Sequence, residues 1–176
     1  MGEASREGSA GPVRAVVVMG VSGSGKSLIG RMVAERLGGD FEDGDDHHPA
    51  ANVAKMAAGR ALTDADRGPW LAVLRGLIEQ RLDDGALPPL VLACSALKGG
   101  YRGELAKPGE AVWFVFLEVE RGTLERRLAA RAGHFFDPKL LDDQLATLEV
   151  PGEGEALRVG EGEPEAMVGV ILRGLG

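Results

Sequence analysis

The sequence contains a single cysteine, Cys94, so an intramolecular disulfide is excluded and a reducing compartment is favoured. No apolar run approaches the roughly 18 residues that cross a membrane. The opening residues MGEASREGSAGP lack the apolar segment of a secretory signal. From these absences we expect a cytoplasmic protein with no membrane partner.

Basic clusters are missing as well. The formal net charge is -7 over 176 residues, and no run of Lys or Arg forms the basic stripe that nucleic-acid binding requires. We therefore expect no nucleic-acid partner. With 44% hydrophobic residues, the chain can bury one good core but is short for two domains. We predict a flexible N-terminal tail over residues 1–12 and a single domain over residues 13–176.

Short apolar runs alternate with amphipathic segments along the rest of the chain, which predicts an α/β fold. The predicted strands span residues 13–19, 41–45, 90–94, 111–119 and 156–159. The predicted helices span residues 26–37, 49–58, 63–82, 98–105, 124–132 and 138–148, and a last one begins near residue 164. This order favours a five-stranded parallel sheet covered on both faces, in which ligands bind beyond the carboxyl ends of the strands.

The segment GVSGSGKS, from Gly20 to Ser27, matches the pattern G-x-x-x-x-G-K-[ST] of a phosphate-binding loop. It lies between a predicted strand and a predicted helix, where backbone N–H groups and the helix N-terminus face a negative charge. Lys26 would bind the β and γ phosphates of ATP, and the Ser27 hydroxyl would be a ligand of Mg²⁺. The predicted nucleotide-binding residues are Gly20, Ser22, Gly23, Ser24, Gly25, Lys26, Ser27 and Leu28.

The phosphate loop alone does not name the phosphate acceptor. Motor ATPases normally carry four apolar residues followed by Asp at a strand end, whereas Leu90 to Ala93 run into Cys94 and Ser95 here. The Asn-Lys-x-Asp segment with which GTPases read guanine is absent. Both classes are disfavoured, and a glycine-rich turn without a ligand is the plainer alternative.

Acidic residues follow the second predicted strand in the segment EDGDDHHP. Asp45 would lie beside the phosphate loop, where it would contact the acceptor hydroxyl or, through water, Mg²⁺. The alternative is a solvated turn that caps the next helix. A zinc site at His47 and His48 is disfavoured, because His134 is the only other histidine and a phosphotransferase needs Mg²⁺, which prefers oxygen ligands.

Four ordered segments carry a more specific signal: the phosphate loop, DGDDHHPAANVAKMAAGRALTDADRGPW, ACSALKGGYR, and RLAARAGHFF with DDQLATLE. Together they resemble the gluconokinases and cover most of the chain from about Val16 to Pro151. The resemblance implies a three-layer P-loop kinase fold with a small helical lid, ATP and Mg²⁺ as cofactors, and phosphoryl transfer to the 6-hydroxyl of D-gluconate. It also implies a homodimer.

The resemblance further assigns roles to single residues. Asp45 would contact the acceptor hydroxyl or the Mg²⁺ shell, and the sugar acid would lie among His48, Arg67, Lys98 and Arg102. Charge-assisted donors of this kind suit a carboxylate and a row of hydroxyls. For Arg67 and Arg102 the alternative is surface ion pairing.

The predicted lid covers about residues 121–148. Arg127 and Arg131 are four residues apart on one predicted helix face and would fold over the phosphates, unless they form a solvated basic face. His134 and Gln144 would hold the substrate or orient the lid. The catalytic set that the resemblance implies is Lys26, Asp45, Arg127 and Arg131.

Three positions depart from the family pattern, and other interpretations stay open. Leu28 replaces a Thr that commonly follows the phosphate-loop serine, His47 stands where the family often has an apolar residue, and Glu118 stands where a neutral or basic residue is expected. A kinase of another small acid, such as shikimate, or of a nucleotide would share the fold. A regulatory module that binds a nucleotide without any acceptor is the reading from a different functional class.

Overall fold

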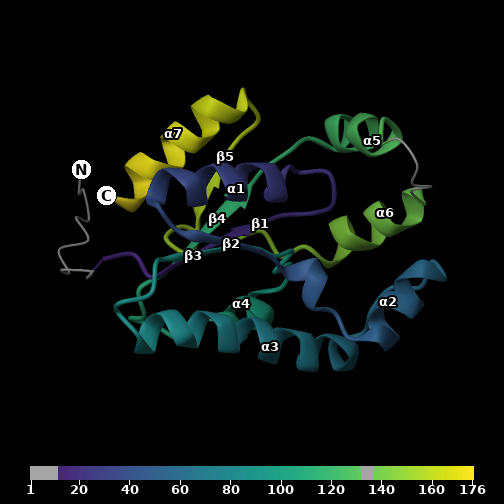
Figure 1. The fold of residues 1–176 in the computed structure, drawn as a ribbon. Helices are drawn as coiled ribbons and strands as arrows, with labels where there is room; N and C mark the ends of the chain where they lie inside the picture. Colours follow the sequence, from purple (N-terminus) through teal and green to yellow (C-terminus); the bar gives the residue numbers. More distant parts are fainter. Residues whose placement is uncertain (1–11, 132–136) are drawn as a thin grey trace.

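The computed structural model describes residues 12–131 and 137–176, and within these ranges the chain forms a three-layer α/β fold (Figure 1). The strands are β1 (Ala15–Met19), β2 (Asp40–Asp43), β3 (Leu90–Ala93), β4 (Val112–Leu117) and β5 (Leu157–Val159). They form one parallel sheet in the order β2-β3-β1-β4-β5. The predicted parallel sheet is confirmed, with five strands in the described part of the chain.

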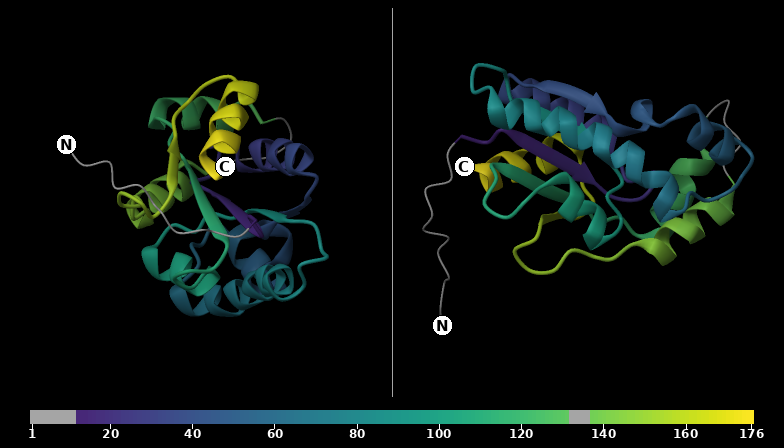
Figure 2. Two further views of the ribbon diagram at one scale, coloured as in Figure 1. Left: turned by 90° about the vertical axis from the view of Figure 1, so that its left-hand side faces the viewer. Right: turned by 90° about the horizontal axis from the view of Figure 1, so that it is seen from below.

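Some helices cover the two faces of this sheet, and others lie beyond one end of it. They are α1 (Lys26–Leu37), α2 (Ala50–Ala57), α3 (Asp64–Asp83), α4 (Gly99–Leu105), α5 (Arg121–Ala129), α6 (Pro138–Thr147) and α7 (Pro164–Leu175), with a 3₁₀ turn, η1 (Gly44–His47). α1 and α7 cover one face of the sheet, and α3 and α4 cover the other (Figures 1 and 2). α2, α5 and α6 lie beyond the sheet, near the N-terminal end of α1 (Figure 1).

Alternation along the central strand β1 divides the core into two apolar clusters. Val17 packs in the cluster that contains Trp70 of α3, whereas Val16 packs in the cluster that contains Val33 of α1. All five residues of β1 are buried, which explains why the strand is a continuous apolar run in the sequence.

A third apolar cluster joins α5 and α6 to the loops at the sheet edge. Its buried members are Val21, Leu97, Leu124, Leu128 and Leu141. Val21 belongs to the phosphate loop, and Leu97 follows β3. The two helices that the sequence assigns to a lid therefore share a core with the phosphate loop.

Several predicted boundaries differ from the structure by one to three residues, and two of these differences bear on the site. β2 ends at Asp43 rather than at residue 45, because Asp43 caps η1 by accepting a 3.1 Å hydrogen bond from the backbone N–H of Asp45. Trp70 holds the first residue of this turn, since its Nε1 donates to Gly44 O over 2.7 Å. The helix expected to reach residue 132 ends at Ala129.

The start of α3 follows the prediction. The Thr63 hydroxyl accepts a 3.2 Å bond from the backbone N–H of Asp66, and Asp66 Oδ2 accepts a 2.7 Å bond from the backbone N–H of Thr63. This reciprocal capping satisfies two N–H groups at the helix start. It fixes the turn that leads from α2 into α3.

The predicted tail and the expected lack of a membrane span can be compared with the structure only over the described residues. The predicted tail over residues 1–12 lies outside the described residues, apart from Pro12. Among the described residues, no helix combines the length and the apolar character of a membrane span.

Candidate active site

The phosphate loop connects β1 to α1, and its glycines shape it. Gly20 has a φ of +149°, and an added Cβ would lie 2.8 Å from Ser24 Oγ. Gly25, with a φ of 95°, is the N-cap of α1 and has no side chain to cap the helix. The N–H groups of the first turn and the positive end of the helix therefore face outward toward an anion.

Lys26 is the first residue of α1, and its ammonium group reaches back across the loop. Its Nζ donates to Val21 O over 3.0 Å. Burial lowers the pKa of Lys26, while the charges of Asp45 and, more weakly, Asp43 oppose that shift. The ammonium group thus lies inside the loop and within the field of both carboxylates.

Ser27 and Asp43 form the pair that fits a magnesium ion. Ser27 Oγ donates a 2.5 Å hydrogen bond to Asp43 Oδ2. A hydroxyl and a carboxylate oxygen are ligands that Mg²⁺ prefers, and its remaining ligands are commonly water and phosphate oxygens. Sequence reasoning chose Asp45 as the carboxylate near Ser27, because it extended β2 by two residues.

Transition-metal ligation finds no support in the described ranges. No group of three or more His, Cys, Asp or Glu side chains could hold a metal ion there. His47 instead pairs with Glu42 over 3.0 Å. The oxygen pair at Ser27 is therefore the arrangement that suits a hard cation.

Asp45 lies in η1 beside His48, and its charge acts on Lys26. Its side chain is 76% exposed, and its Oδ1 lies 3.8 Å from His48 Nε2. Among the charges that raise the pKa of Lys26 against the effect of burial, that of Asp45 is the largest. The contact with an acceptor hydroxyl stays a prediction, from a position that solvent and a ligand can reach.

His48 is held by an aromatic stack and an amide. Its ring lies 4.3 Å from the Trp70 ring, with an interplanar angle of 16°. Asn52 Nδ2 lies 3.4 Å from His48 Nδ1 and donates to Asp66 O over 2.9 Å. Burial lowers the pKa of His48, so the neutral imidazole is favoured at neutral pH.

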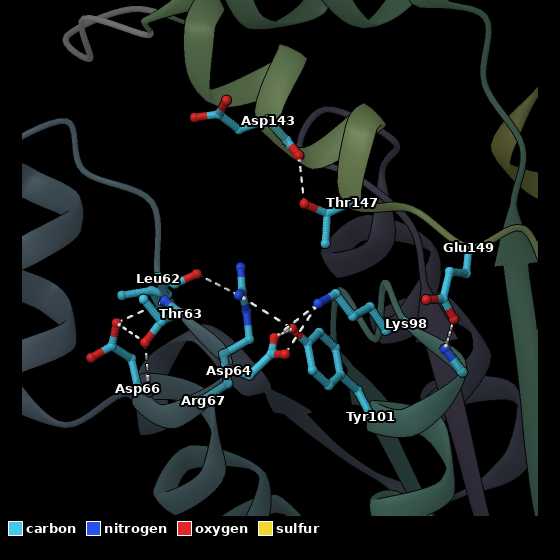
Figure 3. A network of polar contacts seen from close by, with 11 residues as sticks. Leu62, Thr63, Asp64, Asp66, Arg67, Lys98, Tyr101, Asp143, Thr147 and Glu149 are labelled. Atoms are coloured by element: carbon cyan, nitrogen blue, oxygen red, sulfur yellow. Dashed lines mark hydrogen bonds and ion pairs between the residues drawn. The ribbon is translucent and has the colours of Figure 1, made fainter.

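Arg67 and Lys98 meet around the ring of Tyr101 (Figure 3). Arg67 Cζ lies 5.4 Å and Lys98 Nζ 5.5 Å from the ring centroid. Lys98 Nζ bonds to Asp64 Oδ1 over 3.0 Å, and the Tyr101 hydroxyl donates to the same oxygen. These hydrogen bonds, from Tyr101 first and then Lys98, lower the pKa of Asp64. The sequence-predicted cations of α3 and of the α4 N-cap are therefore brought together.

Arg102 is placed differently. It is only 8% exposed, and its Nη1 donates to Ala96 O at 3.1 Å, Leu97 O at 3.4 Å and Glu149 O at 3.2 Å. These bonds tie the loop after β3 to the segment after α6. Arg102 thus supports the loop that carries Lys98, and its contact with a substrate stays an untested prediction.

The predicted lid arginines lie near the phosphate loop, although they do not share one helix. Arg127 Nη1 donates to Gly23 O at 3.2 Å and to Ser24 O at 3.5 Å. Arg131 is exposed and follows the end of α5. After burial, its charge is a further influence that lowers the pKa of Lys26. His134 lies outside the described residues.

Three predicted nucleotide-binding residues have distinct surroundings. The backbone N–H of Ser22 donates to Gln144 Oε1, so Gln144 of α6 contacts the phosphate loop. Ser24 is 1% exposed, and its hydroxyl has no hydrogen-bond partner among the described residues. Leu28, one of the departures from the family pattern, is 55% exposed on α1.

A hollow of about 600 Å³ opens where β4 and β5 end. Its lining residues are Glu118, Val119, Glu120 and Glu161. Glu118, another departure from the family pattern, pairs with Arg158 over 2.5 Å. Glu161 accepts a 2.6 Å bond from the backbone N–H of Glu120 at the start of α5. The hollow is acidic, but these carboxylates serve to hold neighbouring segments.

Comparison with known proteins decides the family. The chain is 46% identical over 162 residues to the gluconokinase of Gluconobacter oxydans strain 621H, and the match covers 91% of this chain and 90% of that protein. This chain belongs to the gluconokinase family. A crystal structure of a gluconokinase from Sinorhizobium meliloti 1021 is 41% identical, has a TM-score of 0.81 and covers 94% of this chain and 93% of its own.

More distant structures share only the fold with this gluconokinase-family member. A shikimate kinase from Acinetobacter baumannii is 16% identical, with a TM-score of 0.55 and 92% of each chain covered. That likeness concerns the P-loop kinase fold alone. No protein-family model matches the chain.

Sequence reasoning missed several residues of the site. Asp43 was passed over because the strand was extended beyond it, although Gly44 directly after it was a signal for a strand end. Asp64, Trp70 and Tyr101 were given other roles or none, because their contacts cross from α3 to η1 and to α4. No local sequence pattern predicts contacts between residues so far apart in the chain.

Proposed function

We propose that this chain transfers the γ-phosphoryl group of ATP to the 6-hydroxyl of D-gluconate, giving 6-phospho-D-gluconate and ADP. The observation that carries the proposal is the 46% identity to a gluconokinase over 91% of the chain. The phosphate loop and the half-buried cations Arg67 and Lys98 support it, since they suit a phosphate donor and a carboxylate-bearing acceptor.

The nucleotide side of the site uses the loop backbone and three side chains. The uncapped N–H groups at the start of α1 and the Lys26 ammonium group bind the phosphates. Ser27 and Asp43 would hold Mg²⁺, which neutralises charge on the β and γ phosphates when it is bound. Arg127 keeps the loop in shape through its bonds to Gly23 O and Ser24 O.

The acceptor side uses cations and a base. The gluconate carboxylate binds Lys98 and Arg67, where it replaces part of the contact that Asp64 now makes with Lys98. Neutral His48, fixed on Trp70, donates from Nε2 to a sugar hydroxyl. Asp45 accepts a hydrogen bond from the 6-hydroxyl.

In the transfer itself, the 6-hydroxyl oxygen forms a bond to the γ-phosphorus, and the bond from that phosphorus to the ADP oxygen breaks. The hydroxyl proton passes to Asp45 and then to solvent. Arg131 approaches the transferring group and offsets its charge. Most of the rate enhancement then comes from positioning and electrostatics, as is usual for phosphoryl transfer.

An acceptor panel tests this function. The purified chain is incubated with ATP and Mg²⁺, and ADP release is followed with gluconate, related sugar acids, shikimate and nucleoside monophosphates. We expect the highest kcat/KM with gluconate, and mass spectrometry should show a singly phosphorylated product. Equal or better turnover of shikimate or a nucleoside monophosphate would overturn the substrate, and ADP release that needs no acceptor would favour a regulatory module.

Lys26→Met is the matched inactive control for the panel. The variant should fold, because the hydrogen bond of the Lys26 ammonium group goes to the loop and not to the core, and it should lose nearly all turnover. Wild-type kcat in this variant would refute the assignment of the phosphate loop.

The family resemblance also supports a homodimer that works in the cytoplasm without nucleic acid. Light scattering coupled to size-exclusion chromatography gives the mass in solution directly. A mass equal to one 18.4 kDa chain at working concentration would refute the dimer.

A further inference from the structure

Gln144 and Ser22 form a reciprocal pair between α6 and the phosphate loop. The backbone N–H of Ser22 donates to Gln144 Oε1 over 2.7 Å, and Gln144 Nε2 donates to Ser22 Oγ over 2.9 Å. The two bonds fix the orientation of the amide, because the reversed amide would set its NH₂ group against the Ser22 N–H. The Gln144 side chain thus binds both the backbone N–H and the hydroxyl of Ser22.

The pair occupies a backbone donor that the phosphate loop would otherwise offer to a nucleotide. In this structure the N–H of Ser22 is satisfied by protein, while the N–H groups at the start of α1 have no side-chain cap. Ser22 is therefore a fixed point of the loop, and its N–H is already hydrogen-bonded to protein. The residues that follow it turn around this point with positive φ at Gly23 and Gly25.

Gln144 is a polar residue on a face of α6 that is otherwise formed by leucines. Leu141, Leu145 and Leu148 of the same face pack in the apolar cluster that includes Val21 of the phosphate loop. Gln144 is the polar member of this face, three residues after Leu141. A leucine would have continued the apolar pattern, so the amide is explained by the two bonds that it makes.

We propose that Gln144 is a positioning residue for the nucleotide site, which holds the phosphate loop in its binding shape through Ser22. A loop that is ordered before the nucleotide arrives loses less entropy on binding. The inference rests on the proposed function only in assigning nucleotide phosphates to this loop. It replaces the sequence-based assignment of Gln144 to the sugar acid.

The test compares Gln144→Leu, Ser22→Ala and the double variant in the full chain. Gln144→Leu keeps a side chain of similar size on this face and removes both hydrogen bonds, whereas Ser22→Ala removes only the bond to the hydroxyl. Gln80→Leu, on an exposed turn of α3, is the matched control. Kd for ADP is measured by calorimetry, KM for gluconate is measured at saturating ATP, and folding is followed by circular dichroism.

We expect Gln144→Leu to raise the Kd for ADP about tenfold, the scale expected when a partly buried donor loses its acceptor. Ser22→Ala should have a smaller effect, and the double variant should bind ADP no more weakly than Gln144→Leu. KM for gluconate should change less than twofold in all of them. Gln80→Leu should behave as the wild type.

Two results would overturn the inference. The first is a Kd for ADP that is unchanged in folded Gln144→Leu, and the second is a rise in KM for gluconate without a change in ADP binding, which would return Gln144 to the acceptor site. If gluconate is not a substrate but ADP binding still weakens in Gln144→Leu, the inference stands and the proposed function fails.

Discussion

Ser27 and Asp43 meet where the phosphate loop passes the end of β2, and the Ser27 hydroxyl donates a 2.5 Å hydrogen bond to Asp43 Oδ2. Ser27 lies in the first turn of α1, and Asp43 is the last residue of its strand. Asp43 also accepts a bond from the backbone N–H of Asp45. One carboxylate therefore links the proposed metal position to the turn that carries the proposed base.

Asp43→Asn should weaken the use of Mg²⁺. The substitution keeps the size of the side chain and removes a negative charge beside Ser27 Oγ, so the Mg²⁺ concentration for half-maximal rate should rise about tenfold. Steady-state rates across a Mg²⁺ series at fixed ATP measure this. Asp46→Asn, an exposed position of the same turn, is the control. An unchanged Mg²⁺ requirement in Asp43→Asn would refute the metal assignment.

Asp45→Asn should lower kcat on the order of 10²-fold or more, the scale of a positioned acid-base group. The variant should fold and bind ATP, because the side chain is exposed and its turn is capped by Asp43. Kinetics at saturating Mg²⁺ and ATP give the answer. Asp46→Asn should lower kcat less. A large loss of kcat in Asp46→Asn with near-normal kcat in Asp45→Asn would show that Asp46, and not Asp45, is the proposed base.

Arg131→Ala should lower kcat more than it weakens gluconate binding. Arg131 follows the end of α5, and its charge lowers the pKa of Lys26. We therefore expect Arg131 to act on the transferring phosphoryl group. A fall in kcat of about tenfold or more with KM for gluconate nearly constant is expected, on the scale of a lost transition-state contact. Arg126→Ala, which removes a cation bonded to Thr123, is the control. If only thermal stability falls, Arg131 has no role over the phosphates.

The Arg75–Glu110 pair should make stability depend on pH. Arg75 donates to both carboxylate oxygens of Glu110, over 2.6 and 2.7 Å, and these bonds lower the pKa of Glu110 to about 2. Because the folded-state pKa lies below the ordinary value of 4.5, the ion pair stabilises the fold above that pH. This stabilisation is lost as the pH falls toward 2.

Glu110→Gln should therefore cost about 2 kcal/mol of unfolding free energy at pH 7 and much less at pH 3. Urea unfolding at both pH values measures the difference. Glu79→Gln is the matched control, because Glu79 also contacts Arg75 but its side chain is 52% exposed, and surface pairs contribute little. An equal loss from Glu110→Gln at the two pH values would show that the charge of Glu110 is not what stabilises the pair.

Local patterns were sufficient for the sheet and the phosphate loop. β1 is buried on both faces and appears in the sequence as an unbroken apolar run, and the loop motif lies between it and α1 in chain order. Thr63 carries its own capping signal, with its partner Asp66 three residues later. Each of these features depends on residues close together in the chain.

The errors arose where distant segments decide the local structure. β2 stops at Asp43 partly because Trp70, 26 residues after Gly44, binds the backbone of that glycine. The contact of Gln144 with Ser22, 122 residues away, was not foreseen either, while its assignment to the substrate or the lid stays a prediction. The pairing of Asp64 with Lys98 likewise requires knowing how α3 packs against α4. Spacing along one helix carries no information about such partners.

The stack of Trp70 on His48 gives the protein an intrinsic optical probe. Trp70 is 1% exposed, binds the backbone of η1 through its indole N–H and touches the imidazole with its face. The only other tryptophan, Trp113, lies in β4 and pairs in register with Val16 of the central strand. Emission from Trp70 therefore follows the charge of His48 and the shape of η1, without any attached label, while Trp113 supplies a steady background from the sheet.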